Sequence, residues 1–263
     1  MIYLLLIIIL IILLYYIQVD EPFKNCTIGM TFDEPYDSPI HFMSKQELQQ
    51  FFKDDPDGYA HSYNRINLHA YGYDTVEEMI NDSIRVADNF TSQEKQMLIK
   101  ECEKVDQFLS TFDKIPFFPA QKVAEIPWVL AKTVKKGYEK GYPHTRMNII
   151  FLPEEVLTLK MLPQILIHEK VHVFSRLYPQ DMKLWNDQNG YISYRRLTDY
   201  PMARNNPDID GIVYLDKHQR ETLSQYKDPY PKSMEEATYP GNDFKNEHPN
   251  EVLAYLVDSY LQI

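Results

Sequence analysis

Apolar residues recur every three or four positions in several stretches of the chain, which is the spacing of one face of an α-helix. The segment 75–90 shows this spacing, and a longer helix is expected to begin after Thr91. Ser44 and Glu47 have the spacing of a capping box, which predicts a short helix at 44–52. Thr91 and Glu94 have the spacing of a capping box. The predicted helix carries one apolar stripe, made of Leu98, Cys102, Val105 and Leu109. We expect this stripe to pack in the core.

Two short apolar runs, bounded by turn and proline signals, predict strands instead. They lie at 145–153 and 210–216. Between and after them, the apolar spacing predicts helices over 163–179 and 249–263. Helices therefore dominate the pattern and strands are few, so the expected fold class is α+β, rich in helices and with a small sheet.

The N-terminus differs from the rest, since residues 2–17 are apolar or aromatic without a single charge. As a helix this run is about 24 Å long, close to the hydrocarbon thickness of a bilayer. No basic residue precedes it and no A-x-A cleavage pattern follows, which favours an uncleaved anchor over a signal peptide. We therefore expect a single-pass transmembrane helix at 1–19. Sequons at Asn25, Asn81 and Asn89 favour a lumenal or extracellular position for the remainder.

Composition narrows the function classes. The 263 residues carry a formal net charge of −11 and no basic cluster, which argues against nucleic acid as a partner. The eight glycines form no phosphate-binding loop, and two cysteines are too few for a zinc site built from thiolates. We divide the chain into the anchor, a loop-rich linker and N-terminal helical region at 20–90, and a main domain at 91–263.

The segment LIHEKVHVFSR contains the pattern H-E-x-x-H. Residues four apart on a helix share one face, so His168 and His172 can direct their imidazole nitrogens at one Zn²⁺ ion. Glu169 lies one step round the helix, from where it can act as general base on a zinc-bound water. The alternative is a helix that carries two histidines by chance, and Lys170 is an unusual residue inside such a motif.

A catalytic zinc site needs a third protein ligand, and no histidine follows at the spacing H-x-x-G-x-x-H. We expect Glu251 to be this ligand. It lies in the first turn of the predicted C-terminal helix among apolar residues, where a carboxylate needs a partner. The simpler interpretation is an acidic residue near a helix N-terminus. Glu247 and His248 are the alternative ligands.

At these residues the chain resembles the gluzincin metallopeptidases, which carry H-E-x-x-H on one helix and a glutamate on a later one. The segment EVLAYLVDSY is similar to the glutamate helix of the lethal-factor type. Together, YPHTRMNIIFLP, LIHEKVHVFSRLYP and EHPNEVLAY resemble the predicted metallopeptidases of large DNA viruses of eukaryotes. The resemblance covers 91–263 and implies a zincin-like catalytic domain, with His168, His172 and Glu251 as zinc ligands and Glu169 as base. Gluzincins often keep a carboxylate one turn after the ligand glutamate, where this chain has Tyr255.

These features together predict a membrane-anchored zinc metallopeptidase that hydrolyses a peptide or protein substrate. The alternative is a non-catalytic membrane protein that uses the domain as a structural or binding module. The resemblance also implies a residue that stabilises the oxyanion, for which the candidates are Tyr239, His248 and Tyr255. The strand at 145–152 is a candidate for pairing with an extended substrate. His144 and Arg146 are candidates for contact with that substrate, and ordinary surface roles are the alternative for both.

Overall fold

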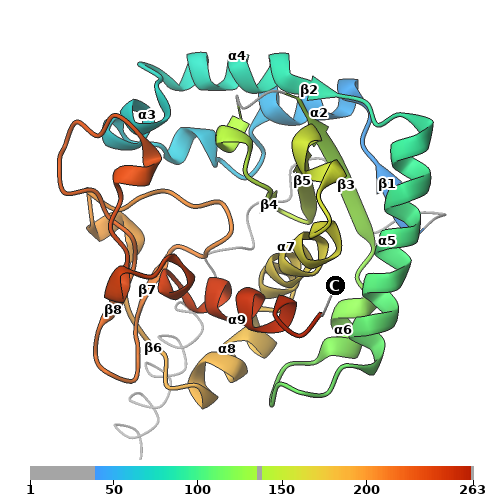
Figure 1. Cartoon of the computed structure of the whole chain (residues 1–263). Coiled ribbons are helices and arrows are strands. Elements are labelled where there is room, and N and C mark those ends of the chain that lie inside the picture. The colour runs from blue at the N-terminus through green and yellow to red at the C-terminus, as the bar shows by residue number, and fades with distance from the viewer. Residues whose placement is uncertain (1–38, 135–137, 262–263) are drawn as a thin grey trace, which may run out of the picture. The chain divides into compact units, whose positions relative to one another are not determined.

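The computed structural model describes residues 39–134 and 138–261, which belong to one compact unit. Figure 1 shows its helices and strands. The α-helices are Lys45–Asp54 (α2), Arg65–Tyr71 (α3), Val76–Val86 (α4), Ser92–Thr111 (α5), Ala120–Ala124 (α6), Leu162–Leu177 (α7), Pro179–Gln188 (α8) and Pro249–Asp258 (α9). The strands are Ile40–Phe42 (β1), Ala87–Asp88 (β2), Trp128–Thr133 (β3), His144–Arg146 (β4), Ile149–Pro153 (β5), Ile192–Arg196 (β6), Ile212–Leu215 (β7) and Glu221–Thr222 (β8). Short 3₁₀ turns connect several of them.

The main sheet has the strand order β1-β3-β5-β4. In addition, β2 pairs antiparallel with the C-terminal end of β3. The three strands β1, β3 and β5 run parallel, whereas β4 is antiparallel to β5 and forms one edge. A second, antiparallel sheet is formed by β6, β7 and β8. The unit is therefore mixed α/β with two sheets, and the expectation of an α+β fold with one small sheet is corrected.

Alternate residues of β3 and β5 face two different cores, because successive side chains of a strand point to opposite faces. Leu130 and Ile150 pack with α5, α6, α7 and α9 in the first core. Ala131 and Phe151 pack with α2, α3 and α4 in the second. Helices thus cover both faces of the main sheet, as Figure 1 shows. Both faces are apolar for this reason, and the sequence of β3 has no alternation that would reveal it as a strand.

Several helix predictions are confirmed. Ser44 and Thr91 each form the reciprocal hydrogen bonds of a capping box, at the starts of α2 and α5. The predicted stripe of α5 is buried, including Cys102, which is a free thiol. The segment 145–153 is wrong as one strand: positive φ at Met147 reverses the chain there, so β4 and β5 form a hairpin.

The predicted membrane anchor is also corrected. Within 39–134 and 138–261, no helix is long and apolar enough to cross a bilayer. The helix α5 has 20 residues, but most of them are polar because only one of its faces is apolar. The apolar run at 2–17 lies outside the described residues. The described fold therefore contains no transmembrane helix, and the expected single-pass membrane location is corrected with the anchor.

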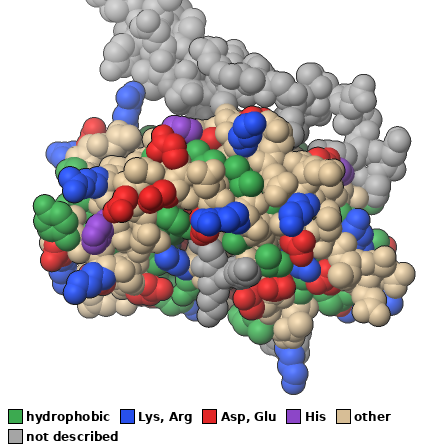
Figure 2. Space-filling model, turned by 90° about the horizontal axis from the view of Figure 1, so that it is seen from above, with side chains coloured by type: hydrophobic (Ala, Val, Ile, Leu, Met, Phe, Trp, Pro, Cys, Tyr) green, Lys and Arg blue, Asp and Glu red, His purple; other side chains and the backbone are tan. Residues whose placement is uncertain are grey.

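Charged side chains of both signs lie intermingled on the face that is seen from the side of α4 (Figure 2). Ion pairs within one helix contribute to this mixture, for example Arg85 with Asp82 at 2.9 Å. Such pairs are exposed to water and contribute little to stability. Positive and negative side chains therefore alternate on this face.

Candidate metal centre

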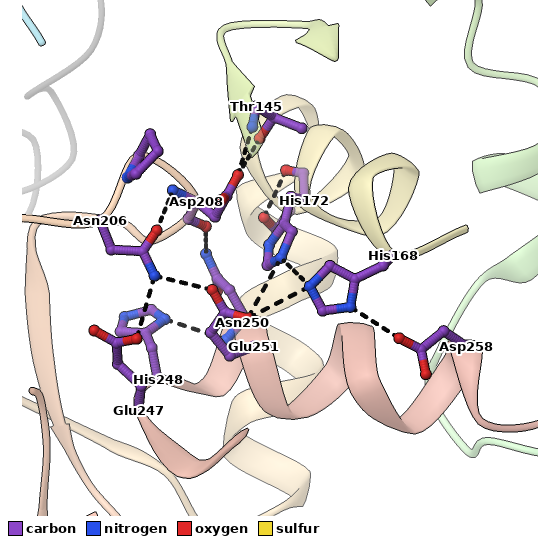
Figure 3. A network of polar contacts seen from close by, with 12 residues as sticks. Thr145, His168, His172, Asn206, Asp208, Glu247, His248, Asn250, Glu251 and Asp258 are labelled. Carbon is purple, nitrogen blue, oxygen red and sulfur yellow. Dashed lines mark hydrogen bonds and ion pairs between the residues drawn. The ribbon is translucent and has the colours of Figure 1, made fainter. Parts of the chain in front are cut away.

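The two histidines of the H-E-x-x-H pattern lie on α7, as predicted. Pro163 occupies the first turn of this helix, where its missing N–H costs no hydrogen bond. The side chain of His172 is fully buried, and that of His168 is 13% exposed. Both point toward α9, which packs against α7. The helix α9 begins at Pro249, so that Glu251 falls in its first turn and faces the histidines (Figure 3).

Three potential ligand atoms converge between these helices. The Nε2 atoms of His168 and His172 lie 3.1 Å apart. The Oε2 atom of Glu251 lies 3.5 Å from the first and 3.7 Å from the second. Ligand atoms held at about 2.0–2.2 Å around a tetrahedral zinc ion are separated by about 3.3–3.6 Å. The donor set and its spacing therefore fit a divalent metal ion of this kind, and this group could hold one.

Asp258 fixes the orientation of the His168 ring. Its Oδ2 atom lies 2.9 Å from His168 Nδ1, which directs Nε2 at the other two potential ligand atoms. Asp258 lies two turns after Glu251 on α9, so the carboxylate partner of His168 comes one turn later than Tyr255. Sequence reasoning missed it. The seven-residue spacing from Glu251, which places both on one helix face, was the available signal.

The charge state of the cluster follows from the same contacts. Burial lowers the pKa of His168, but its hydrogen bonds to Asp258 and Glu251 outweigh burial and hold it well above the ordinary value. Burial raises the pKa of Glu251, but the charge of His172 and the hydrogen bonds of both histidines hold it well below its ordinary value. Glu251 is thus an anionic oxygen donor among imidazoles.

Glu169 lies beside this group and is 3% exposed. Its Oε2 atom is buried, and no residue of the described part of the chain donates a hydrogen bond to it. Burial, together with the nearby charge of Asp208, raises the pKa of Glu169 well above its ordinary value. A carboxylate with one oxygen free and an elevated pKa is suited to taking a proton from a water molecule.

The alternative ligands are placed elsewhere. Arg204 Nη1 donates to both oxygens of Glu247 at 3.0 Å, and Ser224 Oγ donates to one of them. The His248 side chain is the N-cap of α9, with Nδ1 accepting from the Asn250 N–H at 3.2 Å. Its Nε2 atom lies near Asp210 and the Ile212 carbonyl oxygen. Neither residue belongs to the convergent group.

Lys170, the unusual residue of the motif, faces away from the site. It is 1% exposed, and its ammonium group forms an ion pair with Asp106 and donates to the Ala124 carbonyl oxygen at 3.0 Å. The Trp128 ring lies 4.1 Å from its Nζ atom. Lys170 therefore joins α7 to α5, α6 and β3 without touching the histidines. Its charge is compatible with the motif because the helix separates the two faces.

A cleft of about 910 Å³ opens beside the convergent group and is lined by His168 and Glu251, whereas the fully buried His172 is not in its lining. The lining also includes Glu169 and Asp258, and Tyr239 and Tyr255 from the C-terminal region. The Tyr255 ring lies 4.4 Å from the His168 ring. Two of the three oxyanion candidates therefore line the cleft, whereas His248 is buried at the start of α9 and is not in the lining.

The edge strand β4 is less open to a substrate than predicted. The Thr145 N–H donates to Asp208 Oδ1 at 2.7 Å, and the Thr145 carbonyl oxygen accepts from Arg176 Nη2 at 3.4 Å. The outward backbone groups of Thr145 are thus already bonded. Arg146 is 2% exposed and forms ion pairs with Asp55 and Asp57, so it is a structural residue. His144 does line the cleft.

Comparison of the chain with models of known protein families found no match, and comparisons with curated proteins and with solved structures found none either. The assignment of a function therefore depends on the geometry of the site. That geometry places a group that could bind a metal ion, a free carboxylate and an open cleft within one region.

Proposed function

We propose that the protein is a zinc-dependent metallopeptidase, with His168, His172 and Glu251 as metal ligands. The observation that carries the proposal is the convergence of these three ligand atoms within 4.8 Å, at the base of a cleft that also holds Glu169. Two imidazoles and one carboxylate leave a fourth tetrahedral position, which is the composition of a hydrolytic zinc site. When bound, zinc would supply a Lewis acid that polarises the scissile carbonyl group.

Glu169 has the role of general base and acid in this proposal. Its free oxygen takes a proton from the attacking water and returns it to the leaving amine. Asp258 holds His168 in one orientation and tautomer. Of the oxyanion candidates, Tyr239 and Tyr255 qualify by position, since both line the cleft.

The walls of the cleft support a peptide substrate. Among its lining residues, Leu159 and Met161 are 44% and 50% exposed, and Phe244 is 51% exposed. Exposed apolar side chains in the lining of a cleft are suited to the side chains of an extended peptide. The pairing of Thr145 with Asp208 means that the substrate backbone must find its partners elsewhere in the cleft.

The test compares the purified chain with its Glu169→Gln variant, which keeps the size of the side chain and removes the base. We expect both proteins to bind one zinc ion, measured by elemental analysis, and only the parent to cleave a peptide library, with at least a 10²-fold loss in the variant. Equal peptidase activity in the two proteins would refute this mechanism.

A Glu155→Gln variant is the matched control, because this exposed glutamate lies in the same cleft but outside the metal group. We expect it to retain activity. If the parent binds zinc but cleaves no peptide in the library, the result favours the alternative function as a metal-stabilised binding module.

A further inference from the structure

Asn206 connects the candidate metal ligand to a buried ion pair. Its Nδ2 atom donates to Glu251 Oε1 at 3.0 Å and to Glu247 Oε2 at 3.3 Å. Its Oδ1 atom accepts from the Asp208 N–H at 2.9 Å. The amide group of Asn206 therefore donates two hydrogen bonds and accepts one. Because the two neighbours on one side are carboxylates, only the NH₂ end of the amide can face them.

The two oxygens of Glu251 consequently have different surroundings. The Oε1 atom is bound by Asn206, whereas Oε2 faces His168 and His172. A carboxylate with both oxygens free can bind a metal ion through one oxygen or through both. In this site the hydrogen bond from Asn206 engages Glu251 Oε1, the oxygen that Glu251 would need in order to bind a metal ion through both oxygens.

The position of Asn206 is itself held from the other side. Arg204 and Ser224 bind Glu247, which keeps that carboxylate where it accepts the second N–H of the amide. Glu247 is 4% exposed, so these contacts are shielded from water. Figure 3 shows that Asn206 contacts both Glu247 and Glu251. Asn206 lies on a loop and belongs to neither α7 nor α9.

We propose that Asn206 is a positioning residue that restricts Glu251 to one ligand oxygen and so keeps the fourth position at the metal open for water. This inference rests on the proposed zinc site. Without the hydrogen bond, Glu251 can rotate and offer both oxygens, which raises the coordination number. Asn206 thus acts on the metal through its ligand and does not touch the substrate.

The experiment uses the full chain with Asn206→Ala and Asn206→Leu variants. The second keeps the volume of the side chain, which guards against misfolding. We measure zinc affinity by competition with a chromophoric chelator, and the visible absorption spectrum after loading with Co²⁺. We expect zinc binding to weaken 10–100-fold, as is usual when an outer partner of a ligand is lost. The cobalt bands should weaken as the site changes from four to five ligands.

Asn205→Ala is the matched control, since the Asn205 side chain donates to Ser62 outside the site. It should bind zinc and cobalt as the parent does. Parental zinc affinity in the two Asn206 variants would overturn the inference, and so would weaker binding with an unchanged cobalt spectrum. If the parent itself binds no zinc, the proposed function fails together with the inference. If the parent binds zinc and only the Asn206 result is negative, the inference fails alone.

Discussion

His168 and Lys170 are two residues apart on α7 but serve opposite sides of the helix. The first contributes to the convergent group, and the second forms the ion pair with Asp106 beneath the Trp128 ring. Adjacent positions on a helix differ by about 100° in direction, so a charged residue can lie within the motif and outside the site. The face on which a residue lies decides its role here.

Replacement of Lys170 by alanine should destabilise the fold without changing zinc affinity. The substitution leaves the Asp106 carboxylate, itself about one third exposed, without its cation. We expect a loss of about 2–3 kcal/mol in the free energy of unfolding, measured with urea. Lys104→Ala, which breaks an exposed pair with Glu101, should cost less than about 1 kcal/mol. An equally small loss for Lys170→Ala would contradict the importance of its burial.

Asp258→Ala tests the orientation of a ligand from outside the metal group. Removing the carboxylate frees His168 Nδ1 and allows the ring to rotate. We expect zinc affinity to fall about 10–100-fold, as measured by chelator competition. Ser259→Ala is the control, because its hydroxyl group donates to the Leu256 carbonyl oxygen and not to the site. Unchanged affinity in Asp258→Ala would show that His168 is held by packing alone.

At the scale of elements, the short strand β4 is anchored by a turn that lies far from it in the sequence. Asp55 accepts hydrogen bonds from Arg146 at 2.6 Å and from the Ala60 N–H at 3.0 Å. Burial raises the pKa of Asp55, but the Ala60 and His61 hydrogen bonds and the charge of Arg146 outweigh it, so the pKa lies below its ordinary 3.8. The turn after α2 therefore holds the sheet edge next to the cleft.

This depressed pKa predicts a pH dependence of stability. A carboxylate that is more acidic in the folded state stabilises the fold above its unfolded pKa of about 3.9, and the stabilisation is lost as the pH falls through the folded pKa. Asp55→Asn should therefore cost about 2–3 kcal/mol at pH 7 and distinctly less at pH 3, in urea unfolding. Asp54→Asn, at an exposed neighbour, should show no such difference. A cost for Asp55→Asn that is equal at both pH values would contradict the assignment.

At the scale of the whole described unit, the site depends on the packing of α9 across α7. These helices meet through a shared core, in which Leu166, Leu253 and Val257 are fully buried. The metal group is completed only when this contact has formed. Binding and folding are therefore coupled, because the separated helices hold at most two of the three ligands.

Zinc should consequently stabilise the folded chain. At a free zinc concentration of 100 times the dissociation constant, the gain is about 2.7 kcal/mol. Thermal unfolding with and without zinc measures this gain as a higher midpoint, and a chelator should reverse it. The gain should vanish in His172→Ala, which lacks one of the three proposed ligands. An equal gain in that variant would place the stabilising ion elsewhere.

The sequence by itself determined the features that depend on local geometry. The i, i+4 spacing of His168 and His172 is sufficient to place both on one helix face, and the proline before Glu251 marks a helix start. Capping boxes and apolar stripes likewise depend on neighbours within two turns. The proposed ligands were therefore accessible before the fold was known, and the structure brings all three together.

Only the tertiary structure decided the contacts around these ligands. Asp258 lies 90 residues after His168, and Asn206 lies 45 residues before Glu251. Arg146 is paired with Asp55, 91 residues away, rather than with a substrate. Local patterns carry no information about which distant segments become neighbours. Packing of the two cores on either side of one sheet selects these pairs. It also buries every residue of β3, so the sequence of this strand shows no alternation of apolar and polar residues.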